Sequence, residues 1–156
     1  MNDTPIAALA IAEQARKTLY PAPFASVVAG RTKRRVGDHF GLTHYGVNLT
    51  QLAPGAASAL LHSHSQEDEL VYIVSGTAVL ILDTAEFTMQ PGDCCGFKAG
   101  TGKAHQLVNR SGGLVTYLEI GNRAPDDQAE YPNDDLKLAT APDGRRFAVH
   151  KDGTPY

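Results

Sequence analysis

The stretch His62-Ser63-His64-Ser65-Gln66-Glu67-Asp68-Glu69 combines two histidines, one residue apart, with three consecutive acids. Because side chains alternate faces along an extended strand, His62 and His64 point the same way and lie close enough to share one ion. Glu69, from the following strand, and His105, from a third, would complete a shell of nitrogen and oxygen donors that borderline divalent metals accept. The stretch therefore predicts a metal site, around which the rest of the chain is organised.

Turn signals recur at short intervals from Phe24 onward, among them Pro54-Gly55 and Pro91-Gly92-Asp93, with brief apolar or alternating segments between them. This pattern is typical of an all-β sandwich or barrel. We expect strands over residues 25–30, 44–52, 59–62, 69–75, 77–83, 87–89, 94–97, 104–109 and 114–120. A last hairpin is expected from residues 136–140 and 145–150, joined by Ala141-Pro142-Asp143-Gly144.

The expected strand 69–75 is apolar on both faces: Val71 and Ile73 share the face of Glu69, and the other face carries Leu70, Tyr72 and Val74. A strand with two apolar faces is expected to be buried on both sides. A charged, unpaired carboxylate in that environment costs several kcal/mol, so a cation is the natural partner of Glu69. On reach alone, Glu67 and Asp68 compete with Glu69 for this role.

The N-terminal residues 1–24 are expected to form a short helix or arm. A helix would begin at Pro5 after a cap at Asp3 or Thr4, continue through the Ala-rich residues 6–16 and end before Tyr20-Pro21-Ala22-Pro23-Phe24. Such an arm is either a loosely ordered terminus or a segment that lies across a partner subunit.

At 156 residues the chain is long enough for one domain with a core and too short for two. We therefore expect a single all-β domain over residues 25–122 and a more polar C-terminal extension, residues 123–156, that packs on it. The net charge is -3, and the basic cluster Arg31-Thr32-Lys33-Arg34-Arg35 is interpreted as a solvated strand or turn. The wider basic footprint of a nucleic-acid-binding protein is missing, so no nucleic-acid partner is expected.

Cys94 and Cys95 are the only cysteines, and sequence neighbours rarely form a disulfide because their side chains diverge along an extended chain. Two free thiols fit a reducing compartment. The apolar run at residues 6–12 lacks the positive leading region of an export signal, and no apolar run approaches the about 18 residues that span a bilayer. We expect a soluble, cytoplasmic protein without a membrane partner.

Two spaced motifs resemble those of the cupin superfamily. The first cupin motif is similar to a pattern that consists here of Gly55, six residues, His62-x-His64, four residues, Glu69, six residues and Gly76. This pattern has one residue more after the first glycine than the family pattern has. Residues 92–109 resemble the second motif, since Gly102 lies three positions before His105 and Asn109 four after it. In this second motif the proline expected near the middle is absent, and the loop is about two residues longer.

The resemblance implies a jelly-roll barrel, also called a double-stranded β-helix, which hides sheet edges by folding a double sheet on itself. It also implies that one metal ion inside the barrel is bound by His62, His64, Glu69 and His105. The family spacing favours Glu69 over the two acids before it. Asn109, or Gln106 beside the metal histidine, would support the site or pack near it.

Three imidazoles and one carboxylate leave up to two positions open on an octahedral ion, where water or substrate can bind. Zinc, iron, manganese, nickel and cobalt all accept these donors, so the sequence predicts one divalent metal ion without naming it. We expect either a metal-dependent enzyme acting on a small molecule, as a dioxygenase or a sugar-type isomerase, or a sensor or carrier that holds its ligand without turnover. The sequence assigns no catalytic residue; side chains that would line the mouth are Tyr45, Gln51, Tyr72, Lys98, Gln106 and Tyr117.

A homodimer is also expected, because the Pro-rich arm is detached from the all-β domain and exposed sheet edges need covering. A second copy of the chain is therefore the expected macromolecular partner, and a small molecule is the expected ligand.

Overall fold

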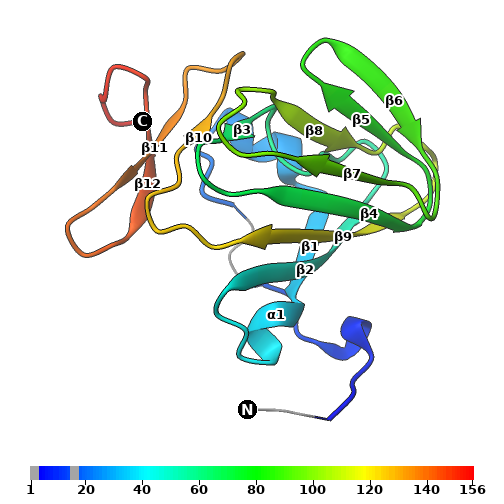
Figure 1. Ribbon diagram of the computed structural model, residues 1–156. Coiled ribbons are helices and arrows are strands. Elements are labelled where there is room, and N and C mark those ends of the chain that lie inside the picture. The colour runs from blue at the N-terminus through cyan, green and yellow to red at the C-terminus, as the bar shows by residue number, and fades with distance from the viewer. Residues whose placement is uncertain (1–3, 15–17) are drawn as a thin grey trace.

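The structure is a computed structural model that describes residues 4–14 and 18–156. It contains two facing layers of antiparallel β-strands, with a small C-terminal hairpin beside them (Figure 1). One layer has the strand order β1-β2-β9-β4-β7, namely β1 (Arg31–Arg35), β2 (Tyr45–Leu52), β9 (Val115–Asn122), β4 (Glu69–Ser75) and β7 (Cys94–Phe97). The expected all-β class is confirmed.

The second layer is built on the three-stranded sheet β6-β5-β8, namely β6 (Ala85–Met89), β5 (Ala78–Leu82) and β8 (His105–Val108). Residues 57–64 extend this layer, since Ala57 bridges Val108 and His62 bridges His105. Beyond them, β3 (Ser63–His64) pairs with β10 (Ala129–Glu130). The expected strand 59–62 is therefore an irregular segment with an isolated bridge at its end.

Apolar side chains from the two layers meet between them and form the main core. Successive side chains of a strand point to opposite faces, so every second residue contributes. The five-stranded sheet supplies Leu52, Val71, Ile73, Val115 and Tyr117, and the three-stranded sheet supplies Ala78, Leu80, Met89 and Leu107. Each sheet therefore buries one face in the sandwich.

The outward face of β4 is not covered within the chain. Val71 and Ile73 are buried, whereas Leu70, Tyr72 and Val74 are 41%, 41% and 45% exposed. The expectation that this strand is buried on both sides is therefore wrong for a single chain, because the second layer covers only the face that carries Glu69.

The N-terminal residues do not form the expected helix over residues 5–16. Within the described part of this segment, the only helical turn is the 3-10 element η1 (Ala8–Ala10); Asp3 and residues 15–16 lie outside the described residues. An isolated helix of this length is marginal in water, and other contacts fix the segment instead. The backbone N–H of Gln14 donates to the Lys33 carbonyl (2.8 Å), and Glu13 pairs with Arg34 (2.9 Å), so the arm lies along β1 of its own chain.

Residues 24–39 also differ from the expectation. A second 3-10 element, η2 (Phe24–Val28), replaces the expected strand 25–30, and β1 is followed by the short helix α1 (Val36–His39). The basic cluster at residues 31–35 pairs along its whole length with β2, so it is a strand of the sheet. None of the helices in the described residues is long and apolar enough to cross a membrane.

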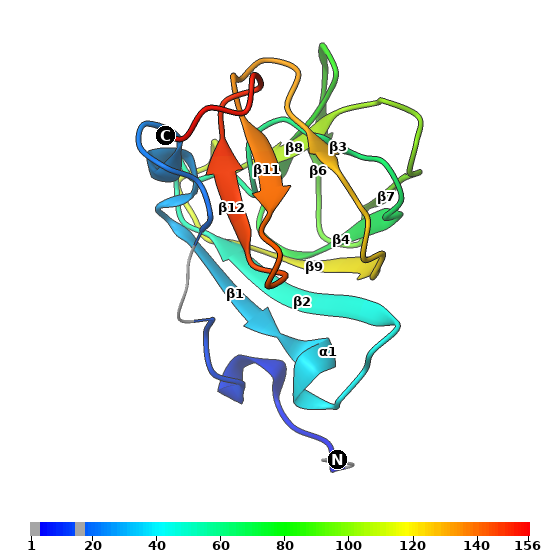
Figure 2. The same cartoon turned by 90° about the vertical axis from the view of Figure 1, so that its left-hand side faces the viewer.

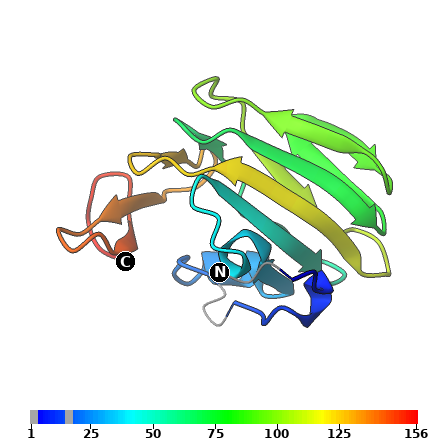
Figure 3. The same cartoon turned by 60° about the horizontal axis from the view of Figure 1, so that its bottom comes forward.

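The expected C-terminal hairpin is present as β11 (Lys137–Thr140) and β12 (Arg146–Val149). It stands in front of β1 and β2 in Figure 2, and beside one end of the two layers in Figure 3. Leu138 and Ala148 of the hairpin pack with Tyr20 of the N-terminal part against a buried cluster of Leu60, Tyr131 and Leu136. The two ends of the chain therefore share a second, smaller core.

Gly121 shows how closely β9 approaches the start of β4. It pairs with Glu69 and Gly46, and a Cβ atom at residue 121 would lie 2.7 Å from the carbonyl oxygen of Asp68. We therefore expect Gly121→Ala to lower the free energy of unfolding by about 1–3 kcal/mol, measured by urea denaturation. Gly112→Ala is the control, because a Cβ atom there meets nothing within 4 Å. Equal stabilities of the two variants would contradict the close approach.

Candidate metal centre

Several backbone hydrogen bonds join the two motifs, and one pair of them connects His62 with His105. The N–H of His105, at the start of β8, donates to the His62 carbonyl (2.7 Å), and the N–H of His62 donates to the His105 carbonyl (3.2 Å). The centroids of the two imidazole rings are 4.6 Å apart. His64 follows two positions later, and its ring centroid lies 4.9 Å from that of His62. Three histidines from two distant parts of the sequence therefore form one cluster.

Glu69, the first residue of β4, joins this cluster from the facing sheet. Its Oε2 lies 3.5 Å from Nε2 of His105 and 3.7 Å from Nε2 of His64. Donor atoms of His62, Glu69 and His105 all lie within 4.8 Å of one another. Ligands bound at about 2.0–2.2 Å from an ion lie at most about 4.4 Å apart, so small side-chain movements bring this set onto one ion. The four residues singled out in the sequence are thus neighbours in space.

Two of the histidines have one ring nitrogen fixed by a hydrogen bond. His62 Nδ1 lies 2.9 Å from the Leu60 carbonyl oxygen, to which it donates, and His64 Nδ1 lies 2.6 Å from Oδ2 of Asp127. A proton held on Nδ1 leaves Nε2 as the nitrogen with a free lone pair. Both rings therefore present the nitrogen that a metal ion needs.

Asp127 is the residue that orients His64, and it comes from the polar segment after β9. Its side chain is almost fully buried, and it accepts the backbone N–H groups of Gln66 (2.8 Å) and Glu67 (3.1 Å). Burial raises the pKa of Asp127, but these N–H groups and His64 outweigh burial and hold the pKa below its usual value. Asp127 is therefore an ionised carboxylate behind a histidine, the arrangement that typically supports metal-bound imidazoles.

Tyr131, a few residues further on, supports the other histidine of the pair. Its ring stacks on that of His62, with centroids 6.0 Å apart and planes at 27°. The side chain belongs to the smaller core, with Leu60 and Leu136. The segment after β9 therefore holds both His62 and His64 from outside the sandwich. This role could not be predicted from the sequence, because nothing in the polar run around Asp127 and Tyr131 sets them apart from surface residues.

His105 is the least satisfied side chain of the cluster. It is 4% exposed, and neither of its ring nitrogens has a hydrogen-bond partner among the described residues. One face of its ring stacks on Phe97, with centroids 3.7 Å apart and planes at 1°. Buried polar atoms without partners cost about 1–3 kcal/mol each, so this position favours a ligand for the imidazole. A divalent cation fits the donors present.

The charges of the cluster also suit a cation. Burial, followed by the neighbouring His105, lowers the pKa of His62 to about 4, so this imidazole is neutral at pH 7. For Glu69, burial raises the pKa, but the contact with His105 and the charges of the three histidines outweigh it and lower the pKa. The neutral His62 imidazole and the ionised Glu69 carboxylate are in the protonation states that metal binding requires.

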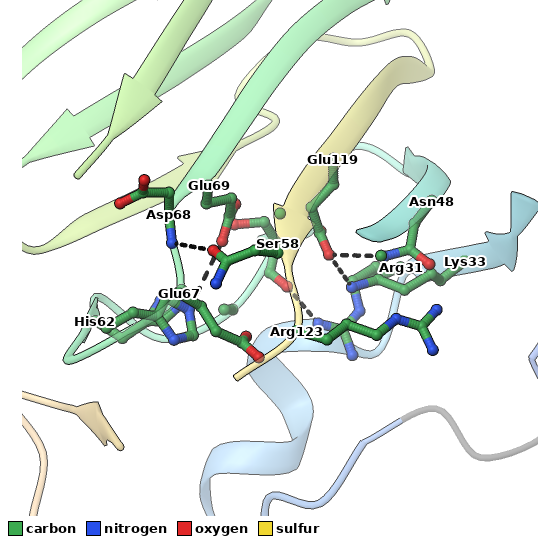
Figure 4. A pocket seen from close by; sticks show the side chains of 15 residues that line it. Arg31, Lys33, Asn48, Ser58, His62, Glu67, Asp68, Glu69, Glu119 and Arg123 are labelled. Carbon is green, nitrogen blue, oxygen red and sulfur yellow. Dashed lines mark hydrogen bonds and ion pairs between the residues drawn. The ribbon is translucent and has the colours of Figure 1, made fainter. Parts of the chain in front are cut away.

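A cavity of about 260 Å³ opens beside the cluster (Figure 4). His62, His64 and Glu69 line one side, and the inner face of β1, β2 and β9 lines the other with Arg31, Lys33, Asn48 and Glu119. Oε1 of Glu119 accepts hydrogen bonds from Nζ of Lys33 (2.6 Å) and from Nδ2 of Asn48 (3.1 Å). Charged groups of both signs therefore face the donor cluster across a space large enough for a small molecule.

The six side chains expected at the mouth do not line this cavity, whose walls hold none of Tyr45, Gln51, Tyr72, Lys98, Gln106 and Tyr117. Tyr117 lies in the main core, and Gln106 donates to the Ala59 carbonyl (2.7 Å). Asn109 donates to the carbonyls of Leu52 (2.8 Å) and Gly113 (2.7 Å), so it ties loops together and does not touch the donor cluster. Part of the wall is instead provided by Arg31 and Lys33 of the basic strand β1, whose sequence had predicted a solvated strand or turn.

Comparison with known proteins gives a consistent result. A family model described as Cupin domain matches residues 48–121. A solved structure from Silicibacter pomeroyi, described as a sugar phosphate isomerase from a cupin superfamily, is 37% identical, with 98% of this chain and 96% of that chain covered and a TM-score of 0.90. A candidate sugar phosphate isomerase from Acidithiobacillus ferrooxidans is 30% identical over 89% of this chain and 96% of that chain, with a TM-score of 0.71. Among curated proteins, no match was found.

The fold extends to more distant structures as well. A protein from Thermotoga maritima, described as a predicted oxalate decarboxylase, has a TM-score of 0.60 over 78% of this chain and all of its own length, although only 16% of residues are identical. The similarity to cupin β-barrels confirms the jelly-roll architecture implied by the two motifs. The chain belongs to the cupin superfamily.

Proposed function

We propose that His62, His64, Glu69 and His105 bind one divalent metal ion, and that the protein is a metal-dependent isomerase of a small sugar-type phosphate. The observation that carries the proposal is that one cavity joins the donor cluster to the ion pair of Lys33 and Glu119. Such a pair offers a base and an acid beside an electrophilic centre. The relatives described as sugar phosphate isomerases support the reaction class.

A divalent ion bound there would polarise the carbonyl or hydroxyl oxygen of the substrate. Interconversion of an aldose and a ketose moves one proton between neighbouring carbons and one between their oxygens, and it consumes no oxidant. Glu119 takes the carbon-bound proton and returns it to the neighbouring carbon. Lys33 and Asn48 hold the carboxylate of Glu119 in position. The Lys33 ammonium donates a proton to the carbonyl oxygen of the substrate and takes one back from the neighbouring hydroxyl, so Lys33 ends the cycle unchanged.

Replacement of the base tests the reaction class. We expect Glu119→Gln to lower kcat on an aldose phosphate by about 10²–10⁴-fold while KM changes little, because a general base acts in the chemical step. Glu130→Gln, at an exposed position on β10, is the matched control and should retain the activity. The proposal is wrong if a panel of aldose phosphates is bound without turnover, as in a sensor, or if turnover requires oxygen, as in a dioxygenase.

Replacement of Asp127 tests the support of His64. We expect Asp127→Asn to weaken metal affinity by about 10–100-fold, because the imidazole loses the carboxylate that fixes its orientation. Competition with a chromophoric chelator measures the affinity. Asp126→Asn is the control, since the structure shows no contact of that side chain with the histidines. Equal metal affinities of the Asp127 and Asp126 variants would show that Asp127 does not support the metal site.

We further propose a homodimer in which a second copy covers the outward face of β4. Leu70, Tyr72 and Val74 give this face three exposed apolar side chains in a row and no charge. Covering it would bury the strand on both sides, as its apolar sequence favours. Sedimentation should give a mass about twice the 16.6 kDa of one chain, and Tyr72→Glu should shift it toward the monomer. A wild-type mass of one chain at micromolar concentration would contradict the dimer.

A cytoplasmic location is part of the same proposal. Cys94 and Cys95 are free thiols, and Cys94 is exposed. Exposed free thiols persist in a reducing compartment, which supports the cytoplasm.

A further inference from the structure

A second cavity continues outward from the one beside the histidines. It has a volume of about 550 Å³ and shares Arg31, Lys33 and Arg123 with the inner cavity. Its walls include residues of β1 on one side and of the hairpin β11–β12, with the turn between its strands, on the other. A ligand with one end at the histidines could therefore reach this cavity with its other end.

Basic side chains dominate the walls of this outer cavity. Six of them line it, against a single carboxylate, Asp38; we call this set the arginine pocket, and its members are Arg31, Lys33, Arg35, Arg123, Arg145 and Arg146. The chain as a whole carries a net charge of -3, so this is a local concentration of positive charge. A concave site with one sign of charge attracts ligands of the opposite sign.

The carboxylates nearby neutralise only part of this charge. Asp38 pairs with both Arg35 and Arg123, and Lys33 pairs with Glu119. On the hairpin, Arg145 has only a solvent-exposed contact of 3.7 Å with Asp143. Arg146 has no ion pair with a carboxylate in the part of the chain that the structure describes. The hairpin arginines are therefore available to an anion.

Arg146 is also linked to the donor cluster through Tyr131, which lines the outer cavity and stacks on His62. Burial raises the pKa of Tyr131 and the positive charge of Arg146 opposes that rise, so the guanidinium lies within electrostatic range of the phenol. Arg146 and Tyr131 thus line the same cavity, and Tyr131 connects its wall with the donor cluster.

We propose that the arginine pocket binds the phosphoryl group of the substrate, with Arg145 and Arg146 of the hairpin contacting it from one side and β1 from the other. Arginine forks donate paired hydrogen bonds to phosphate oxygens, and several cations together match the double charge of a phosphate monoester. The inference rests on the proposed function in one respect: the phosphoryl group is taken to belong to the substrate of an isomerase. The hairpin lies outside residues 48–121, which the family model covers, so this specificity is added to the cupin core.

Inorganic phosphate is the probe that tests the pocket. We expect it to bind the metal-loaded protein at low ionic strength in isothermal titration calorimetry, and more weakly as salt is added. The double variant Arg145→Ala, Arg146→Ala should bind it at least about tenfold more weakly, a difference of about 1.4 kcal/mol. Arg110→Ala is the control, because Arg110 pairs with Glu86 and lines neither cavity, and it should bind as the wild type does.

Equal affinities of the wild type and the double variant, or no binding by the wild type, would overturn the arginine pocket. If the double variant loses structure by circular dichroism, Arg146→Gln and Arg146→Lys replace it, with the lysine variant expected to retain more affinity. Phosphate binding that depends on the hairpin, without turnover of any aldose phosphate, would contradict the isomerase proposal but not the phosphate site. If the double variant turns over an aldose phosphate with an unchanged KM, the phosphate site is contradicted but the isomerase proposal is not.

Discussion

The candidate centre depends on the antiparallel backbone pairing of His62 with His105. Two hydrogen bonds, of 2.7 and 3.2 Å, fix the ends of two segments that are far apart in the sequence. Because the pairing places the imidazoles on the same side, the carboxylate of Glu69 has only to enter from the facing sheet. Rigid strands hold donor atoms more accurately than loops do, which explains why a metal centre can form in a sandwich of this size. If this pair slipped by one residue, the histidines would point to opposite faces.

The C-terminal extension contributes side chains to the candidate site as well as covering one end of the sandwich. Asp127 orients His64, Tyr131 stacks on His62, and the hairpin supplies one wall of the arginine pocket. The two cavities share Arg31, Lys33 and Arg123, but the inner one also holds the imidazoles and most of the carboxylates, whereas the outer one adds Arg35, Arg145 and Arg146. This division matches a substrate that has a carbonyl at one end and a phosphoryl group at the other.

The sequence predicted the parts of the site that depend on local spacing. The alternation of His62 and His64 and the strand beginning at Glu69 followed from periodicity, and most strand positions followed from turn signals. Asp127, Tyr131 and the inner side of β1 were missed, because their roles arise from contacts between distant segments and from charged residues that show no apolar face. The prediction of an N-terminal helix was wrong, and Glu13 and Gln14 of that segment contact β1 instead. The prediction that β4 is buried on both sides was wrong because strand periodicity shows that a face is apolar but not what covers it.

The central claim is that the four clustered side chains hold a metal ion, and elemental analysis tests it most directly. Protein purified without oxygen should contain about one equivalent per chain of a divalent metal such as zinc, iron, manganese, nickel or cobalt. The variant His62→Ala, His64→Ala should contain none while it retains the fold by circular dichroism. A full equivalent of metal in that variant, or a wild-type protein that cannot be loaded with any of these metals, would contradict the account.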